Sequence, residues 1–69
     1  MSDIEMTTII AVINMAARHE GRWYWTGTAV SAEYSRAKRF TTREEAFCEW
    51  NDNAANYPDW HATLIDVAA

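Results

Sequence analysis

Cysteine and histidine are scarce in this chain of 69 residues, which contains one Cys and two His. A single cysteine, Cys48, excludes an intrachain disulfide. Two histidines and one cysteine also offer no spacing typical of a zinc site. The sequence therefore predicts a domain without a structural metal and without a cofactor.

Long hydrophobic runs are missing as well. The apolar run from Ile9 to Ala17 has about half the length of a membrane-spanning helix. The N-terminal segment "MSDIEMTT" is acidic and lacks the basic region of a secretory signal. We expect a cytoplasmic protein with a reduced thiol and no membrane partner.

Basic residues are few: six Lys and Arg against ten Asp and Glu give a formal net charge of −4. This balance argues against broad affinity for a nucleic-acid backbone, which depends on Lys and Arg. Two interpretations of the charge remain, namely solubility and a surface for a basic partner. Because no catalytic motif is recognisable either, we predict that the protein is not an enzyme.

Hydrophobic residues, by contrast, make up 49% of the chain and include four Trp, three Tyr and two Phe. This composition predicts one folded domain over residues 1–69. A chain of this length buries only about 60% of the surface that it exposes when unfolded, so its core is marginal. Oligomerisation or partner binding is the remaining source of extra stability.

Two segments predict a β-hairpin. Residues 6–17 can be interpreted as a capped helix or as a strand, and the many β-branched residues between Thr7 and Ile13 favour the strand. Residues 22–30 are aromatic and β-branched and predict a second strand. The short connection favours antiparallel pairing. Residues 31–40 are expected to form a loop or an irregular edge segment.

The clearest element is a helix over residues 42–55, which ends before Pro58. Two residue pairs have the spacing of a capping box at its start: Thr41 with Glu44, and Thr42 with Glu45. Four residues form the predicted core stripe: Ala46, Phe47, Trp50 and Ala54. A third strand is expected over residues 60–67. The order β–β–α–β predicts an α+β fold with one helix on a three-stranded antiparallel sheet.

The hairpin loop decides which side chains face this helix. A two-residue turn would force Glu20 into positive φ, whereas a three-residue loop, residues 19–21, requires positive φ only at Gly21. The three-residue loop places Ala16 opposite Tyr24. The predicted helix-facing side then comprises Ile9, Ala11, Ile13, Met15, Ala17, Trp23 and Trp25. The predicted outer side comprises Ile10, Val12, Asn14, Ala16, Arg18, Arg22, Tyr24, Thr26 and Thr28.

The outer side of the sheet is one candidate interface, because a single helix covers only one face. An uncovered apolar patch marks an interaction surface, unless residues 31–40 fold over it. The predicted contacts on this side are Val12, Asn14 and Tyr24.

The acidic side of the helix is a second candidate. Glu45, Glu49 and Asp52 follow i, i+4, i+7 spacing and share one side. They are either a solvated surface or a mimic of phosphate that meets Lys and Arg of a partner. The basic residues Arg36, Lys38, Arg39 and Arg43 alternate with aromatic ones, and we expect them to be solvated or paired with acids. Cys48 is expected to be a structural thiol, at least half-buried.

The phrase "AKRFTTREEAF", Ala37 to Phe47, follows the aromatic hairpin and precedes "HATLIDV". This arrangement resembles many short phage and prophage proteins with a hairpin, a helix and a closing strand. Small acidic proteins of this kind include the anti-CRISPR proteins, which bind a CRISPR effector and block it. The resemblance implies a non-enzymatic inhibitor whose partner is a larger protein or ribonucleoprotein complex. Two other functions are open: a homodimeric structural or accessory module, and a weak nucleic-acid-binding protein.

Overall fold

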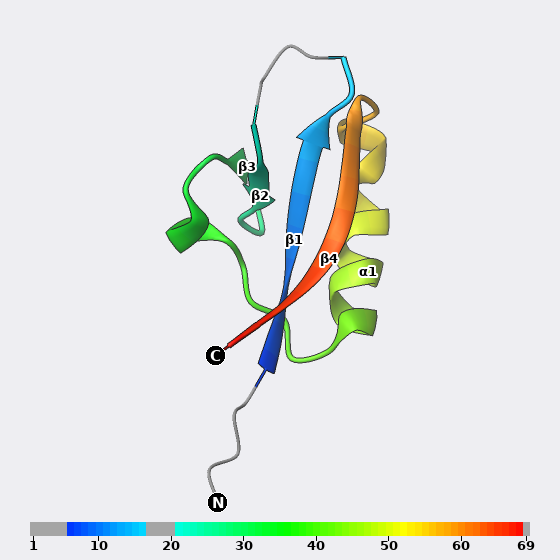
Figure 1. The fold of residues 1–69 in the computed structure, drawn as a ribbon. Coiled ribbons are helices and arrows are strands. Elements are labelled where there is room, and N and C mark those ends of the chain that lie inside the picture. The colour runs from blue at the N-terminus through cyan, green and yellow to red at the C-terminus, as the bar shows by residue number, and fades with distance from the viewer. Residues whose placement is uncertain (1–5, 17–20, 69) are drawn as a thin grey trace, which may run out of the picture.

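Four strands and one α-helix make up the fold seen in the computed structural model, which describes residues 6–16 and 21–68 (Figure 1). The elements in chain order are β1 (Met6–Asn14), β2 (Trp23–Trp25), β3 (Val30–Ser31), the 3-10 turn η1 (Tyr34–Arg36), α1 (Arg43–Asn53), the 3-10 turn η2 (Ala54–Asn56) and β4 (Trp60–Ala68). The strands form one antiparallel sheet in the order β3-β2-β1-β4, and α1 packs against one face. The predicted α+β class with one helix on an antiparallel sheet is confirmed, whereas the predicted three strands are four.

The additional strand arises because residues 22–30 do not form one continuous strand. Gly27 has a φ of 102°, in the left-handed region that glycine adopts without steric cost. Around it the Thr26 amide donates a hydrogen bond to the Ala29 carbonyl at 2.9 Å, which closes a tight turn. The turn separates β2 from β3 and pairs Trp25 with Val30.

Residues 6–14 form the strand β1, which decides between the helix and the strand predicted for residues 6–17; Ala17 lies outside the described residues. It pairs with β4 along its whole length, from Met6 opposite Ala68 to Asn14 opposite Trp60. On its other side it pairs with β2. β1 is therefore a central strand with neighbours on both sides, and β4 is a long outer strand.

The predicted register of the hairpin is wrong. Tyr24 lies opposite Ala11 rather than Ala16. A shift by an odd number of residues exchanges the two faces of β1. Gly21 has the predicted positive φ, 88°, but it belongs to a connection longer than three residues, part of which lies outside the described residues. The loop residues His19 and Glu20 also lie outside them.

The core lies between the sheet and α1. Its buried members are Ile10, Val12, Trp25, Phe40, Ala46 and Trp50. Trp23 and Trp25 face the helix, as predicted. The β1 residues were predicted on the wrong faces: Ile10 and Val12 are in the core, and Ile9 and Ala11 are buried on the outer face instead.

The helix begins at the second of the two predicted caps. Thr42 is the N-cap, and its hydroxyl accepts a hydrogen bond from the Glu45 amide at 3.2 Å. Ala46 and Trp50 are buried as predicted, but Phe47 is 58% exposed. Successive helical residues point about 100° apart, so Ala46 and Phe47 do not share one face. The half-buried Glu49, three residues after Ala46, is on the inner side instead.

Candidate functional site

The residues predicted to bind a partner are divided between opposite faces of the sheet. Tyr24 is half-buried on the outer face, since it pairs with Ala11. Glu45 and Asp52 are exposed on α1, which covers the other face. The structure therefore does not bring the sheet residues and the acidic residues into one site.

Two predicted contacts on the sheet are unsuited to partner binding. Val12 is completely buried under the helix, at 0% exposure, so its placement on the outer side is corrected. Asn14 is 8% exposed at the end of β1, where its Oδ1 accepts a hydrogen bond from the Ala16 amide at 2.9 Å. This bond is an Asx turn, which directs the chain out of the strand.

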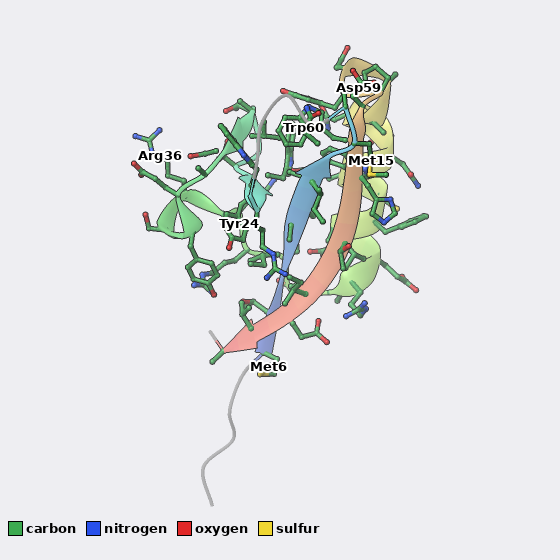
Figure 2. All side chains as sticks on the ribbon, turned by 45° about the horizontal axis from the view of Figure 1, so that its top comes forward. Met6, Met15, Tyr24, Arg36, Asp59 and Trp60 are labelled. Carbon is green, nitrogen blue, oxygen red and sulfur yellow. The ribbon has the colours of Figure 1, made fainter. Side chains whose placement is uncertain are left out.

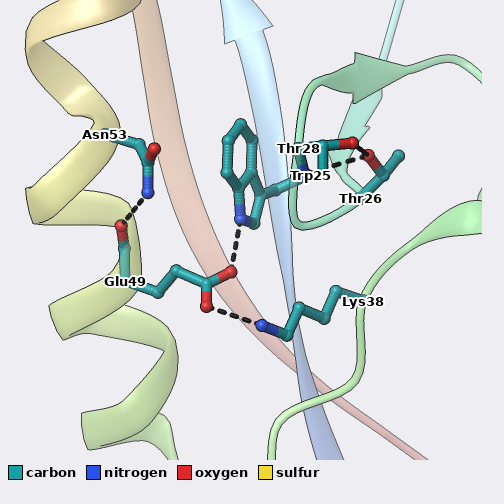
Figure 3. Close-up of polar contacts among 6 residues, drawn as sticks. All are labelled: Trp25, Thr26, Thr28, Lys38, Glu49 and Asn53. Carbon is teal, nitrogen blue, oxygen red and sulfur yellow. Dashed lines mark hydrogen bonds and ion pairs between the residues drawn. The ribbon is translucent and has the colours of Figure 1, made fainter.

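Glu49 is a structural residue rather than part of a free acidic surface (Figure 3). One of its carboxylate oxygens accepts a hydrogen bond from Trp25 Nε1, and the other accepts one from Lys38 Nζ, both at 2.6 Å. Burial alone would raise the pKa of Glu49, but the bonds from Lys38 and Trp25 and the charge of Lys38 together lower this pKa below its usual value. Glu49 thus holds α1 against β2 and against the segment before the helix.

The acids on the remaining surface of α1 are unpaired. The carboxylates of Glu44, Glu45 and Asp52 are exposed and make no ion pair or side-chain hydrogen bond with any described residue. Two of these residues, Glu44 and Glu45, occupy the first turn, where negative charge interacts favourably with the helix dipole. This acidic surface, Glu44, Glu45 and Asp52, faces solvent.

The predicted basic cluster, in contrast, is occupied by contacts within the chain. Arg36 pairs with Glu33 at 3.1 Å, Lys38 with Glu49 at 2.6 Å, and Arg43 with Asp66 at 3.0 Å. Arg39 Nη1 donates hydrogen bonds to Thr7 Oγ1 and to the Ala68 carbonyl. This confirms the expectation that the cations pair with neighbouring acids, apart from Arg39, which binds neutral oxygens.

The outer face is partly covered by the segment that follows β3. The rings of Tyr24 and Tyr34 meet edge to face at 5.4 Å, and Arg39 lies over Tyr34 at 5.9 Å. Figure 2 shows Tyr24 on the side of the molecule that also carries Arg36 of η1. We call the side chains of Tyr24, Tyr34 and Arg39 the outer cover. Of the two predicted arrangements, an uncovered outer face and an outer face covered by residues 31–40, the second is found around Tyr24.

A groove between α1 and β4 was missed by the sequence prediction. It has a volume of about 300 Å³, and its wall is almost entirely apolar. Its lining residues are Arg43, Glu44, Phe47, Cys48 and Leu64. Cys48 is exposed here, so the predicted burial of its thiol is wrong. The helical angle of about 100° between Ala46 and Phe47 indicates that only one of them can face the sheet, and the structure places Phe47 outward.

Among residues 6–16 and 21–68 there is no group of three or more His, Cys, Asp or Glu placed to hold a metal ion. No helix in the described part of the chain has the length and apolarity to cross a membrane. No protein-family model matches the chain, and no significantly similar curated protein or solved structure was found.

Proposed function

We propose that this chain is a non-enzymatic binding protein that occupies a basic surface of a larger protein or ribonucleoprotein complex. An inhibitor of the anti-CRISPR type, which blocks a nucleic-acid-binding or subunit-binding surface of a CRISPR effector, is the specific form of this proposal. The observation that carries it is the asymmetry of charge. Glu44, Glu45 and Asp52 on α1 have no ion-pair partner among the described residues, whereas the basic cluster is occupied by intramolecular contacts.

The asymmetry favours a basic partner over direct nucleic-acid binding. Phosphate contacts need accessible Lys and Arg, but Lys38 and Arg43 already pair with Glu49 and Asp66. Unpaired carboxylates on a rigid helix can instead steer association with a positively charged surface.

The wall of the groove also favours binding over catalysis. An active site needs several polar groups converging in a cleft. In the groove, Arg43 and Glu44 contribute almost only apolar surface, beside Phe47, Cys48 and Leu64. The arrangement fits a contact surface and not a reaction centre.

A panel of purified CRISPR effector complexes tests the specific form. We expect the chain to block target binding by at least one complex. Glu45→Gln combined with Asp52→Asn removes two unpaired charges from α1 and should weaken inhibition at least tenfold, equivalent to about 1.4 kcal/mol. The matched control, Glu33→Gln with Asp59→Asn, removes two exposed charges outside α1 and should leave inhibition within about twofold of the original.

Three results would contradict the proposal. Failure to inhibit any complex rejects the anti-CRISPR form. Equal loss in the two double variants rejects the acidic surface as the contact. A shift of nonspecific DNA or RNA in a gel at physiological salt would show that the partner is nucleic acid instead.

A further inference from the structure

The outer edge of β4 lacks most of the devices that usually protect the edge of a sheet, and Asp66 is its one charged residue. β4 has nine residues, from Trp60 to Ala68, and contains no Pro, Gly, Lys or Arg. Its pairing with β1 is continuous, without a bulge. Within the described residues it pairs with β1 alone, and Figure 1 shows it as the outermost long strand. Such an edge is a template for pairing with another strand.

The hydrogen bonds of β1 identify the backbone groups on this edge. The Met15 amide donates to the Asp59 carbonyl, and Thr8 exchanges two bonds with Phe40 on the other side of β1. In an antiparallel pair the bonded residues alternate. Odd-numbered residues of β4 therefore bond to β1, whereas the N–H and C=O groups of Ala62, Leu64 and Asp66 point away from the sheet.

We propose that β4 pairs with β4 of a second copy to form a two-fold symmetric dimer. This inference concerns assembly and does not depend on the proposed function. The two-fold axis passes by Leu64, so that Leu64 lies opposite Leu64 of the second copy and Ala62 lies opposite Asp66. Each of these three pairs exchanges two main-chain hydrogen bonds, so every outward amide of the three residues is satisfied.

The side chains of β4 are complementary to a second copy in this register. Asp66 is the only formally charged residue of β4, and it lies opposite Ala62, so like charges do not meet. Its carboxylate is already bound by Arg43 and by Thr8 Oγ1. On the outer face Thr63 lies opposite Ile65, a pair of β-branched residues suited to strand pairing.

The groove provides apolar area on both sides of the axis. Directly opposite residues in an antiparallel pair point to the same face, so both α1 helices lie on one side of the eight-stranded sheet. Main-chain bonds alone would make a small interface, because stable interfaces bury about 1,200–2,000 Å². Phe47, Cys48 and Leu64 beside the edge enlarge the contact. Within the described residues the outer strand at the other end of the sheet is β3, which has two residues and is too short to extend the assembly beyond two copies.

Light scattering and amide exchange on the full chain test the dimer. We expect a mass of twice 7.9 kDa at high concentration, with dissociation on dilution. In the dimer the amides of Leu64 and Asp66 should exchange slowly, and dilution should make them exchange at least tenfold faster. The amides of Thr63 and Ile65 bond to β1 and should stay protected in both states.

Two substitutions of exposed apolar residues separate the interface from the rest of the surface. Phe47→Glu places a charge in the groove and should weaken dimerisation at least tenfold. Met15→Glu changes a residue that is 70% exposed in the turn after β1 and should leave dimerisation unchanged. Protection at Thr63 and Ile65 verifies that each variant is folded.

Three outcomes would overturn the proposal. The first is a monomer at all concentrations up to about 1 mM. The second is a dimer in which Leu64 and Asp66 exchange as fast as in the monomer. The third is equal weakening of the dimer by Phe47→Glu and Met15→Glu.

Discussion

Ile9 and Ile10 are consecutive residues of β1 and are almost equally buried, at 1% and 0% exposure, but on opposite faces of the sheet. Ile10 belongs to a cluster built from large side chains of several elements, among them Trp25, Phe40 and Trp50. Ile9 is buried without belonging to that cluster. The two residues thus illustrate two ways of burying a side chain: packing within a core cluster, as for Ile10, and cover by a few side chains from a neighbouring segment, as for Ile9.

The inner face of the sheet is covered by a layer of packed aromatic side chains beneath α1, whereas the outer face is covered by only a few side-chain contacts. Within the layer Trp25 makes edge contacts with Trp50 and Tyr57 and a hydrogen bond to Glu49. On the outer face, the outer cover runs from Tyr24 through Tyr34 and Arg39 to Thr7 of β1. Ile9 lies between Ala11, opposite Tyr24, and Thr7. A small domain with one helix can thus bury both faces of its central strand, but fewer contacts stabilise the cover of the outer face.

Replacing each isoleucine with alanine tests this difference most strongly. Ile→Ala in a core costs about 2–5 kcal/mol, and the cost depends on how far the surroundings collapse into the cavity. We expect Ile10→Ala to lower the free energy of unfolding by about 4 kcal/mol, because the large aromatic side chains around Ile10 cannot move into the cavity. Ile9→Ala should lower the free energy of unfolding by about 2 kcal/mol, because the side chains of the outer cover can move into the cavity. Urea unfolding followed by tryptophan fluorescence measures both.

A milder pair keeps this test usable if the alanine variants do not fold. Ile10→Val and Ile9→Val should each cost about 0.5–1.5 kcal/mol, with the larger loss again at Ile10. Equal losses at the two positions would mean that the outer face is closed as firmly as the inner one.

The second test concerns the polar link of the inner layer. Glu49→Ala leaves the N–H of Trp25, a residue only 2% exposed, without its acceptor and should cost about 1–3 kcal/mol. Glu49→Gln keeps an oxygen for Trp25 but removes the charge that Lys38 binds, so it should cost less, about 1 kcal/mol. Urea midpoints at neutral pH rank the two variants. A smaller loss for Ala than for Gln would contradict the role of the Trp25 bond.

The same link predicts a dependence on pH. Because the pKa of Glu49 is lower in the folded chain than its ordinary value of 4.5, its contribution is fully present above pH 4.5 and is lost as the pH falls through the folded value. The original protein should therefore lose more stability on acidification below pH 4.5 than Glu49→Gln does. Other carboxylates titrate in both proteins, so the difference between the curves isolates Glu49. Parallel curves would refute the assignment.

Local signals predicted some elements correctly. The two capping pairs, Thr41 with Glu44 and Thr42 with Glu45, located the start of α1 to within one residue, and the β-branched composition of residues 7–13 favoured a strand. The register of β1 could not be derived in this way. A strand that is covered on both faces shows no alternation of apolar and polar residues, so "TTIIAVI" does not reveal which side chains face the helix. The rings of β2 were nevertheless assigned correctly, since Trp23 and Trp25 face the core.

The candidate contacts were harder to predict because hydrophobicity was misleading on α1. Glu49 lies inward, where Trp25 and Lys38 satisfy its carboxylate, and Phe47 lies outward beside the groove. Both positions depend on partners that are distant in the sequence. Helical geometry indicates that Ala46 and Phe47 diverge, but only the tertiary contacts show which of them is buried.

The smallest expected effect belongs to the outer cover. Tyr34→Ala removes the edge contact with Tyr24, worth about 0.5–1.5 kcal/mol, and the exposed cation–π contact with Arg39, worth about 0.5–1 kcal/mol. Because Tyr34 is itself 46% exposed, we expect a net loss near 1 kcal/mol. The matched variant Tyr34→Phe keeps the ring and should change stability by less than about 0.5 kcal/mol. Urea unfolding distinguishes the two, and equal stability of both variants would show that the ring does not close the outer face. In the double variant Tyr34→Ala/Ile9→Val, the two losses in unfolding free energy should not be additive, because both residues help to cover the outer face. In Tyr34→Ala/Ile10→Val the losses should be additive, because the two residues lie on opposite faces of the sheet.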